Sequence, residues 1–217
     1  MAEHVGYSPF HFTRLFTAAV KIPPGKYLTA LRLHAAKRLL LEGTDAVIDV
    51  ATAVGFDSLS SFSRAFRQGV GLPPGGFRRL AEHVADAPVR PFSVLPDSTA
   101  HVRIRLDVPD DLRPAAQLMI WVGWFPHPAP FGLPTAGRLV EAAHDIELPL
   151  CPGSPWLLAF AVARHAEVGE QLAPSQPLVA LHPMPITAPG EARLRFQPAP
   201  AAAPPLLSAL PSLRPAS

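Results

Sequence analysis

Two arginines, Arg14 and Arg64, stand 50 residues apart in the chain, and each lies between two phenylalanines. The stretches read Phe-Thr-Arg-Leu-Phe at residues 12–16 and Phe-Ser-Arg-Ala-Phe at residues 62–66. Helical spacing places the two rings of each stretch on one face and the arginine on the opposite face. A guanidinium there can donate to two acceptors at once, as on the edge of guanine. The alternative is a solvated arginine that only covers the core.

The likeness between the two regions extends beyond these stretches. The run Val-Lys-Ile-Pro-Pro-Gly at 20–25 recurs as Val-Gly-Leu-Pro-Pro-Gly at 70–75, again at an offset of 50. Upstream, Val5-Gly6 matches Val54-Gly55 at an offset of 49, so the second copy has one more residue in its turn. A constant offset over so many positions indicates an internal duplication. Each copy has the pattern helix, tight turn, helix.

Capping signals place the ends of these helices. Ser8 precedes a proline where the first-copy helix would begin, and Asp57 or Ser58 takes that place in the second copy. Residues 47–54 form an earlier helix with an apolar stripe, which Gly55 would end. The expected buried positions are Phe12, Leu15 and Phe16 in the first copy and Phe62, Ala65 and Phe66 in the second.

One longer helix, from Pro24 to Leu41, is expected to join the two copies and to end at Gly43. Its apolar face is assigned to Leu28, Leu31, Ala35 and Leu39. At 1.5 Å per residue it would span roughly 27 Å. That length can hold two helices about one turn of duplex DNA apart, roughly 34 Å, so that both enter the major groove on one side.

The composition changes near residue 81. Only five of the 28 prolines precede Leu80, and residues 1–81 carry ten Lys and Arg against five Asp and Glu, whereas 82–217 carry nine against twelve. A basic half suits a polyanionic partner. We therefore expect a helical domain over 1–81, a linker over 82–98, a mainly β domain over 99–197 and a disordered tail over 198–217.

Cys151 is the only cysteine, which excludes an intrachain disulfide and a zinc site with two or more cysteines. The chain has neither a basic, apolar leader at its start nor an 18-residue apolar run. We therefore expect a cytoplasmic protein with no membrane partner.

The helical half resembles the AraC/XylS family of bacterial transcription regulators over about residues 2–80. The similarity is carried by Leu31-Arg32-Leu33 in the joining helix, Val54-Gly55-Phe56 at the turn, the run 61–67 in the second-copy helix, and Gly71-Leu72-Pro73-Pro74 with Phe77-Arg78 after it. The resemblance implies an all-α tandem helix-turn-helix fold, homeodomain-like, in a sequence-specific DNA-binding regulator. It implies double-stranded DNA as partner, leaves a small-molecule effector and RNA polymerase open as further partners, and implies no cofactor.

Two positions depart from the family. The chain starts at Met1 inside what the family has as the second helix of its first unit. We therefore expect either a true start upstream or a weakened first unit. Ala46 stands where the family favours a capping serine, and Asp45 is expected to cap instead.

Residues that point away from the apolar stripes are the candidate DNA contacts: Phe10, His11, Thr13, Arg14 and Thr17 in the first copy, and Ser60, Ser61, Arg64 and Arg67 in the second. By similarity to the family, Phe10, Thr13, Arg14, Ser60, Ser61 and Arg64 stand where base edges are read. Lys37, Arg38, Arg78 and Arg79 are expected to face phosphate or solvent. His34 is expected at the surface.

The second half alternates polar and apolar residues at 101–106 and 191–196, and has continuous apolar runs at 118–125, 156–163 and 178–181. These patterns predict an antiparallel β sandwich or barrel, with residues 136–144 open as a short helix. Trp121, Trp124, Phe125 and Trp156 would be core in preference to lining a ligand pocket. Family members commonly add a domain that senses an effector or dimerises, and both roles stay open here.

An enzymatic second half is the rival reading. His127, His144, Asp145 and His165 are chemically capable, but their spacing matches no metal-ligand pattern. Cys151 lacks a flanking histidine, and Gly153-Ser154-Pro155 is not a nucleophile motif. We therefore expect no catalytic residues and no metal site.

Overall fold

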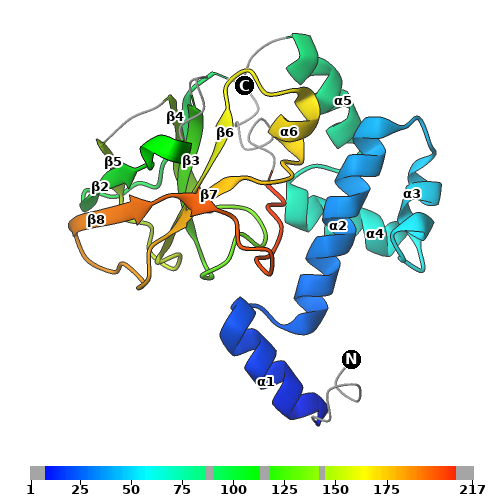
Figure 1. Cartoon of the computed structure of the whole chain (residues 1–217), viewed down its shortest axis with the longest axis horizontal. Helices are drawn as coiled ribbons and strands as arrows, with labels where there is room; N and C mark the ends of the chain where they lie inside the picture. The colour runs from blue at the N-terminus through cyan, green and yellow to red at the C-terminus, as the bar shows by residue number, and fades with distance from the viewer. Residues whose placement is uncertain (1–7, 87–89, 113–117, 142–144, 209–217) are drawn as a thin grey trace.

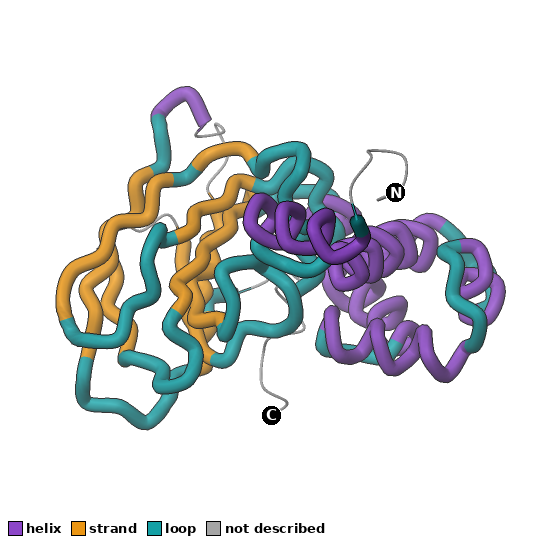
Figure 2. Tube along the Cα trace, turned by 90° about the horizontal axis from the view of Figure 1, so that it is seen from below, coloured by secondary structure: helices purple, strands orange, loops and turns teal. Residues whose placement is uncertain are grey.

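The computed structural model describes residues 8–86, 90–112, 118–141 and 145–208. Helices fill the first part and strands the second, so the two expected fold classes are confirmed (Figures 1 and 2). The first part contains α1 Pro9–Val20, α2 Pro24–Glu42, α3 Val47–Ala53, α4 Leu59–Val70 and α5 Pro74–Asp86. None of the described helices is long and apolar enough to cross a membrane.

The helix ends follow the capping signals in both copies. The Ser8 hydroxyl accepts a hydrogen bond from the His11 amide at the start of α1, and Ser58 does the same for the Ser61 amide of α4. The copies differ at their C-terminal caps. Gly71 ends α4 with φ of 96°, whereas Lys21 ends α1 with φ of 68°. The first copy therefore places a side chain in the left-handed region that glycine occupies in the second.

The expected cap of α3 is wrong. Ala46 occupies the N-cap position, no side chain caps the helix, and Asp49 is the acidic residue of the first turn. The Asp45 carbonyl instead accepts a hydrogen bond of 2.8 Å from the Arg78 guanidinium of α5. Asp45 is therefore used as a backbone acceptor, which ties the α2–α3 turn to α5.

The second helical unit has a closed apolar core built from α2, α3, α4 and α5. The face of α2 that enters it carries Ala30, Leu33, Ala36, Lys37 and Leu40. The expected face of Leu28, Leu31, Ala35 and Leu39 is wrong for its first three residues: Leu28 and Leu31 are 47% and 42% exposed, and Ala35 is exposed. Leu39 is partly buried and packs against this core. Both sets of residues have helical spacing, and the set that is buried in the core is the one that includes Lys37.

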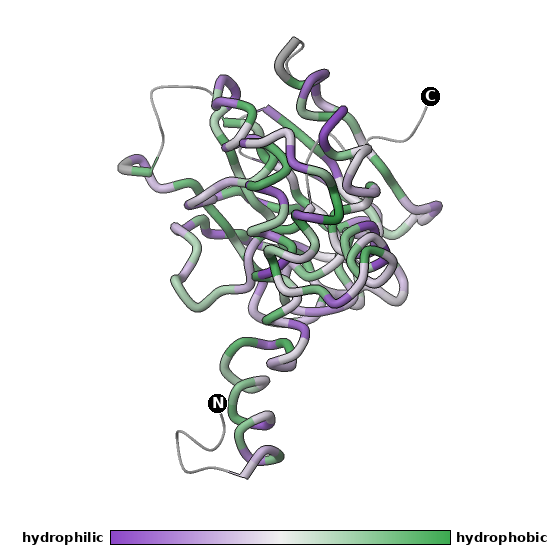
Figure 3. The backbone as a smooth tube through the Cα atoms, turned by 90° about the vertical axis from the view of Figure 1, so that its right-hand side faces the viewer, coloured by the Kyte–Doolittle hydropathy of each residue, from purple (hydrophilic) through white to green (hydrophobic). Residues whose placement is uncertain are grey.

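The first helical unit has no comparable core. None of the α1 residues is buried: Phe12 and Phe16 are half-buried and Leu15 is exposed, so their assignment to the core is wrong. Phe16 packs edge-on against Tyr27 of α2, with ring centroids 5.3 Å apart. Figure 3 shows α1 projecting away from the rest of the molecule. One neighbouring helix supplies too little surface to enclose the two rings.

The second part contains two packed sheets. A six-stranded sheet has the order β1-β4-β3-β6-β7-β9, and a three-stranded sheet has the order β5-β2-β8. The bounds are β1 Phe92–Val94, β2 His101–Asp107, β3 Leu118–Phe125, β4 Ala136–Glu141, β5 Asp145–Pro149, β6 Trp156–Ala163, β7 Leu178–Leu181, β8 Gly190–Arg195 and β9 Gln197–Pro198, with α6 Val168–Leu172 and a short 3-10 turn at Asp110–Leu112. Side chains of both sheets share one core, as in a sandwich.

Strand β3 is buried along its whole length, which explains its unbroken apolar run. Ile120, Val122 and Trp124 face the sandwich core, whereas Met119 and Trp121 join a second cluster on the outer face of the six-stranded sheet. Trp121, Trp124 and Phe125 are fully buried, in agreement with the expected core role, and Trp156 is half-buried.

Three details of the second part differ from expectation. Strands β2 and β8 pair in parallel, so only the six-stranded sheet is antiparallel throughout. Residues 136–141 form strand β4 in place of a helix, because β1 and β3 flank them, and 142–144 lie outside the described residues. The expected linker contains the end of α5 and strand β1.

The expected disordered tail is also different. Residues 199–208 are described, and Leu206, Leu207 and Ser208 are buried between the two parts. Residues 209–217 lie outside the described part of the chain. Residues 199–208 are rich in alanine and proline, but Leu206 and Leu207 supply apolar surface that packs against both parts of the protein.

Candidate nucleic-acid interface

Helix α4 separates its residues cleanly into two faces. Phe62 and Phe66 are completely buried, whereas Ser60, Ser61, Arg64 and Arg67 are exposed. Contacts between neighbouring aromatic rings fix this orientation. The ring centroids are 5.3 Å apart for Phe56 and Phe62, 5.5 Å for Phe62 and Phe66, and 5.6 Å for Phe66 and Phe77. The core therefore holds α4 with four polar side chains directed outward.

The exposed serines at the start of α4 form a local hydrogen-bond network. The Ser58 hydroxyl lies 3.3 Å from the Ser60 hydroxyl and 3.0 Å from the Ser61 hydroxyl, and the Ser61 hydroxyl donates to the Ser58 carbonyl at 2.9 Å. These hydroxyls can rotate, since each is both donor and acceptor. The helix end can therefore offer hydroxyl donors or acceptors to an external partner.

The turn before α4 requires a left-handed residue. Gly55 has φ of 83° between α3 and α4. A Cβ there would meet the Arg32 guanidinium at 3.4 Å, and this guanidinium also lies over the Phe56 ring at 6.0 Å. Arg32 of α2 thus covers the turn that sets the angle of α4.

Helix α1 presents a less enclosed version of the same face. Phe10 is 79% exposed, Thr13 and Arg14 are exposed, and His11 and Thr17 are half-buried. The Thr13 hydroxyl donates to the Pro9 carbonyl at 2.8 Å. Seven of the nine predicted contact residues are therefore exposed. The structure distributes them over two separate helices, α1 beyond the N-terminal end of α2 and α4 packed beside its middle (Figure 1).

Two of the four basic side chains that were expected to face phosphate or solvent, Lys37 and Arg78, contact other parts of the protein. Lys37 is completely buried, so its expected exposure is wrong. Arg78 donates to the Leu40 carbonyl at 3.4 Å and thereby caps the end of α2. Arg38 pairs with Glu42 at 3.5 Å on the surface. The periodic position of Lys37, in phase with Ala30, Leu33 and Leu40, was the signal for its burial.

Burial also governs the ionisation of two α2 side chains. The pKa of Lys37 falls to about 7 because its ammonium has lost water. His34, expected at the surface, is half-buried with its Nδ1 atom lacking a partner among the described residues. Burial, followed by the charges of Lys37 and Arg38, lowers the pKa of His34 to about 4, against a smaller opposing effect of Glu170.

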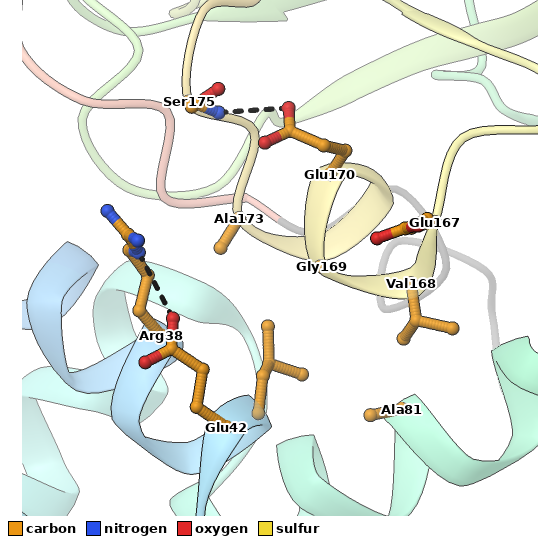
Figure 4. Close-up of a pocket in the computed structure, with 10 residues that line it drawn as sticks. Arg38, Glu42, Ala81, Glu167, Val168, Gly169, Glu170, Ala173 and Ser175 are labelled. Atoms are coloured by element: carbon orange, nitrogen blue, oxygen red, sulfur yellow. Dashed lines mark hydrogen bonds and ion pairs between the residues drawn. The ribbon is translucent and has the colours of Figure 1, made fainter.

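A groove of about 450 Å³ lies where the helical part meets α6 (Figure 4). Leu41, Ala81, Val168 and Ala173 supply its apolar surface. Its rim carries Arg38, Glu42, Glu167 and Glu170, and Glu170 accepts a hydrogen bond from the Ser175 amide at 3.1 Å. The groove therefore borders α2 and α5 on one side and the β domain on the other.

The residues considered for catalysis were His127, His144, Asp145, Cys151 and His165. Among the described residues, no group of three or more His, Cys, Asp or Glu side chains is placed to hold a metal ion. His144 lies outside the described residues. Cys151 is buried in the sandwich core, where loss of solvent raises the pKa of its thiol.

Comparison with known proteins assigns the helical part. Residues 1–80 match the family model described as a helix-turn-helix domain. The regulator Rv1931c of Mycobacterium tuberculosis is 37% identical over 79 residues, which cover 36% of this chain and 30% of the relative. Residues 1–80 are a helix-turn-helix domain of the AraC type.

Further relatives share the same AraC-type domain. The transcriptional activator AarP of Providencia stuartii is 35% identical over 78 residues, covering 36% of this chain and 58% of AarP. The melibiose operon regulatory protein of Escherichia coli K12 is 29% identical over 82 residues, covering 38% of this chain and 27% of that protein. The matches thus span less than two thirds of these relatives. They support a DNA-binding transcription regulator and leave the β domain unassigned.

Proposed function

We propose that this protein regulates transcription by binding specific duplex DNA sequences, with α1 and α4 entering successive major grooves. The observation that carries the proposal is the division of α4 into a buried face with Phe62 and Phe66 and an exposed face with Arg64 and Arg67. Arginine can donate to both acceptors of guanine in the major groove, and serine and threonine pair with several bases. The helix thus offers the side chains that direct readout uses.

The length of α2 supports the two-groove arrangement. Its 19 residues span about 28 Å at 1.5 Å per residue, close to the roughly 34 Å of one duplex turn. With α1 beyond the N-terminal end of α2 and α4 packed beside Leu33 near its middle, the two recognition helices would then read half-sites about 10 base pairs apart.

Selection from a random duplex library tests the proposal. The full chain should enrich sequences with two short conserved blocks whose centres are about 10–10.5 base pairs apart. Enrichment of a single block would retain specific binding and reject the role of α1. No enrichment above an unselected pool, at salt low enough for phosphate contacts, would reject sequence-specific binding.

We also propose that the β domain modulates the helices and has no catalytic role of its own. Burial of Cys151, which raises its thiol pKa, supports this because a protonated, buried thiol is a poor nucleophile. A thiol reagent should react with the folded protein far more slowly than with the denatured protein. Rapid reaction in the folded state would reopen a nucleophilic role. The molar mass from sedimentation then separates the two remaining roles: an oligomer indicates self-association, and a monomer indicates modulation within one chain.

A further inference from the structure

The segment after β9 returns along the boundary between the two domains, and two adjacent leucines in it face opposite sides. Leu206 packs with Met119, Trp121 and Phe160 on the outer face of the six-stranded sheet. Leu207 enters the core of the second helical unit and is completely buried. We call residues 204–208 the strap. Its two leucines therefore contribute to one apolar cluster in each domain.

The strap is also held by hydrogen bonds to both domains. The Lys37 ammonium of α2 donates to the Leu206 carbonyl at 3.2 Å and to the Leu207 carbonyl at 3.0 Å. The Ser208 hydroxyl donates to the Gly132 carbonyl of the β domain at 3.1 Å. A buried ammonium that satisfies two backbone acceptors fixes the position of this extended segment.

The strap packs closely against α4 at a glycine. A Cβ on Gly69 would lie 2.9 Å from Leu33 Cδ1 and 3.1 Å from Leu207 Cδ1. The equivalent residue of the first copy, 50 positions earlier, is Ala19, which is exposed. Among the described residues, a segment from the far end of the chain completes the core of the second duplicated unit and not that of the first.

We propose that the strap couples the β domain to the second helix-turn-helix unit. The two unfold as one cooperative unit only while Leu206 and Leu207 are packed in their clusters. Helix α6 also contacts this unit, through Val168 and Leu172. The strap differs because it inserts a side chain into each domain and is anchored by Lys37. If the proposed function holds, displacement of the strap would loosen α4 and weaken DNA binding.

Spectroscopy can follow each domain separately in the full chain, without DNA. All three tryptophans, Trp121, Trp124 and Trp156, lie in the β domain, so their fluorescence reports its unfolding. Circular dichroism at the helix band reports mainly α1 to α5. Wild-type protein should show coincident thermal midpoints for the two signals, as expected of a single cooperative unit.

Three strap variants should separate these midpoints by at least about 5 °C. They are Leu206→Ala, Leu207→Ala and a chain that ends at Ala203. A chain that ends at Ser208 keeps the strap and is the matched control, with midpoints that remain coincident. Midpoints that coincide in all three variants, or that are already separate in the wild type, would overturn the proposal. If the chain ending at Ala203 fails to fold, the two point variants decide.

Discussion

At Arg64 the guanidinium is exposed on the face of α4 opposite the buried rings, and this position predicts a base contact. Replacing Arg64 with alanine should weaken binding to the selected site by about 1–3 kcal/mol and relax the preference at one base pair. Mobility-shift titration against the selected site and its single-base variants measures both effects. Arg14→Ala should cost less, because α1 has no buried residue to hold it.

Arg195→Ala provides the matched control, since Arg195 is an exposed arginine on β8 of the other domain. It should leave both affinity and base preference unchanged. An equal loss on every duplex sequence after Arg64→Ala would identify a phosphate contact in place of a base contact.

The left-handed cap positions of the two copies give a reciprocal prediction. Gly71→Lys should destabilise the second unit by about 1–2 kcal/mol, because a side chain at φ of 96° clashes with its own backbone. Lys21→Gly should stabilise α1 by a smaller amount, about 0.5 kcal/mol, since glycine also gains unfolded-state entropy. Amide hydrogen exchange in α1 and α4 measures each effect locally. Increased exchange in α1 after Lys21→Gly would contradict it.

Individual residues were predictable from sequence where the cause is local. The N-caps depend only on the residues that follow them: Ser8 caps α1 as expected, and Ser58, one of the two candidates with Asp57, caps α4. Lys37 and His34 were misassigned because residue type suggests the surface, whereas their surroundings come from the strap and α6, which are distant in sequence.

At the scale of elements, the duplicated helices α1 and α4 differ in how much apolar surface covers them. Phe62→Ala should therefore destabilise the helical domain by about 3–5 kcal/mol, because it empties a completely enclosed site. Phe12→Ala should cost less than about 1.5 kcal/mol, because Phe12 is half-buried and water can fill the space left. Chemical denaturation followed by circular dichroism measures both. Equal losses would show that α1 is enclosed in solution.

The periodic elements were predicted well, and those defined by neighbours were not. Strands β2, β3, β6, β7 and β8 appear where alternation or apolar runs placed them. Strands β1 and β9 are two or three residues long and exist through pairing with β4 and β7. On α2 two stripes have helical spacing, and only the packing of α4 and α5 decides that the one with Leu33 is buried.

At the scale of the whole molecule, the buried Lys37 predicts how stability changes with pH. The pKa of Lys37 is about 7 in the folded protein and 10.5 in an exposed lysine. Between these values the unfolded chain binds more protons, so the free energy of unfolding rises with pH. We expect a gain of about 2 kcal/mol between pH 7 and 9, measured by chemical denaturation.

Lys37→Met should remove this rise, because methionine has no proton to exchange. His34, one turn earlier on α2, changes the free energy of unfolding at lower pH than Lys37 does. With its pKa lowered to about 4, the stability that it contributes is lost as pH falls from 6.5 towards 4. A free energy of unfolding that still rises between pH 7 and 9 in Lys37→Met would assign the effect to another group.

The relation between the two domains was the least predictable feature. The break in composition near residue 81 correctly indicated two kinds of structure. It gave no sign that Leu207, 126 residues beyond residue 81, would complete the core of the second helical unit. Such a contact depends on the path of the whole β domain, which no local pattern encodes.

The most direct test of the account is to change the rotation between the two half-sites. In the selected duplex, five base pairs inserted between the half-sites turn one of them to the opposite face, whereas ten restore the same face. We predict that five base pairs reduce the affinity of the full chain to that of a single half-site, because α2 holds α1 and α4 at a set separation. Affinity that is unchanged by five base pairs, in mobility-shift titrations at matched salt, would contradict the two-groove model.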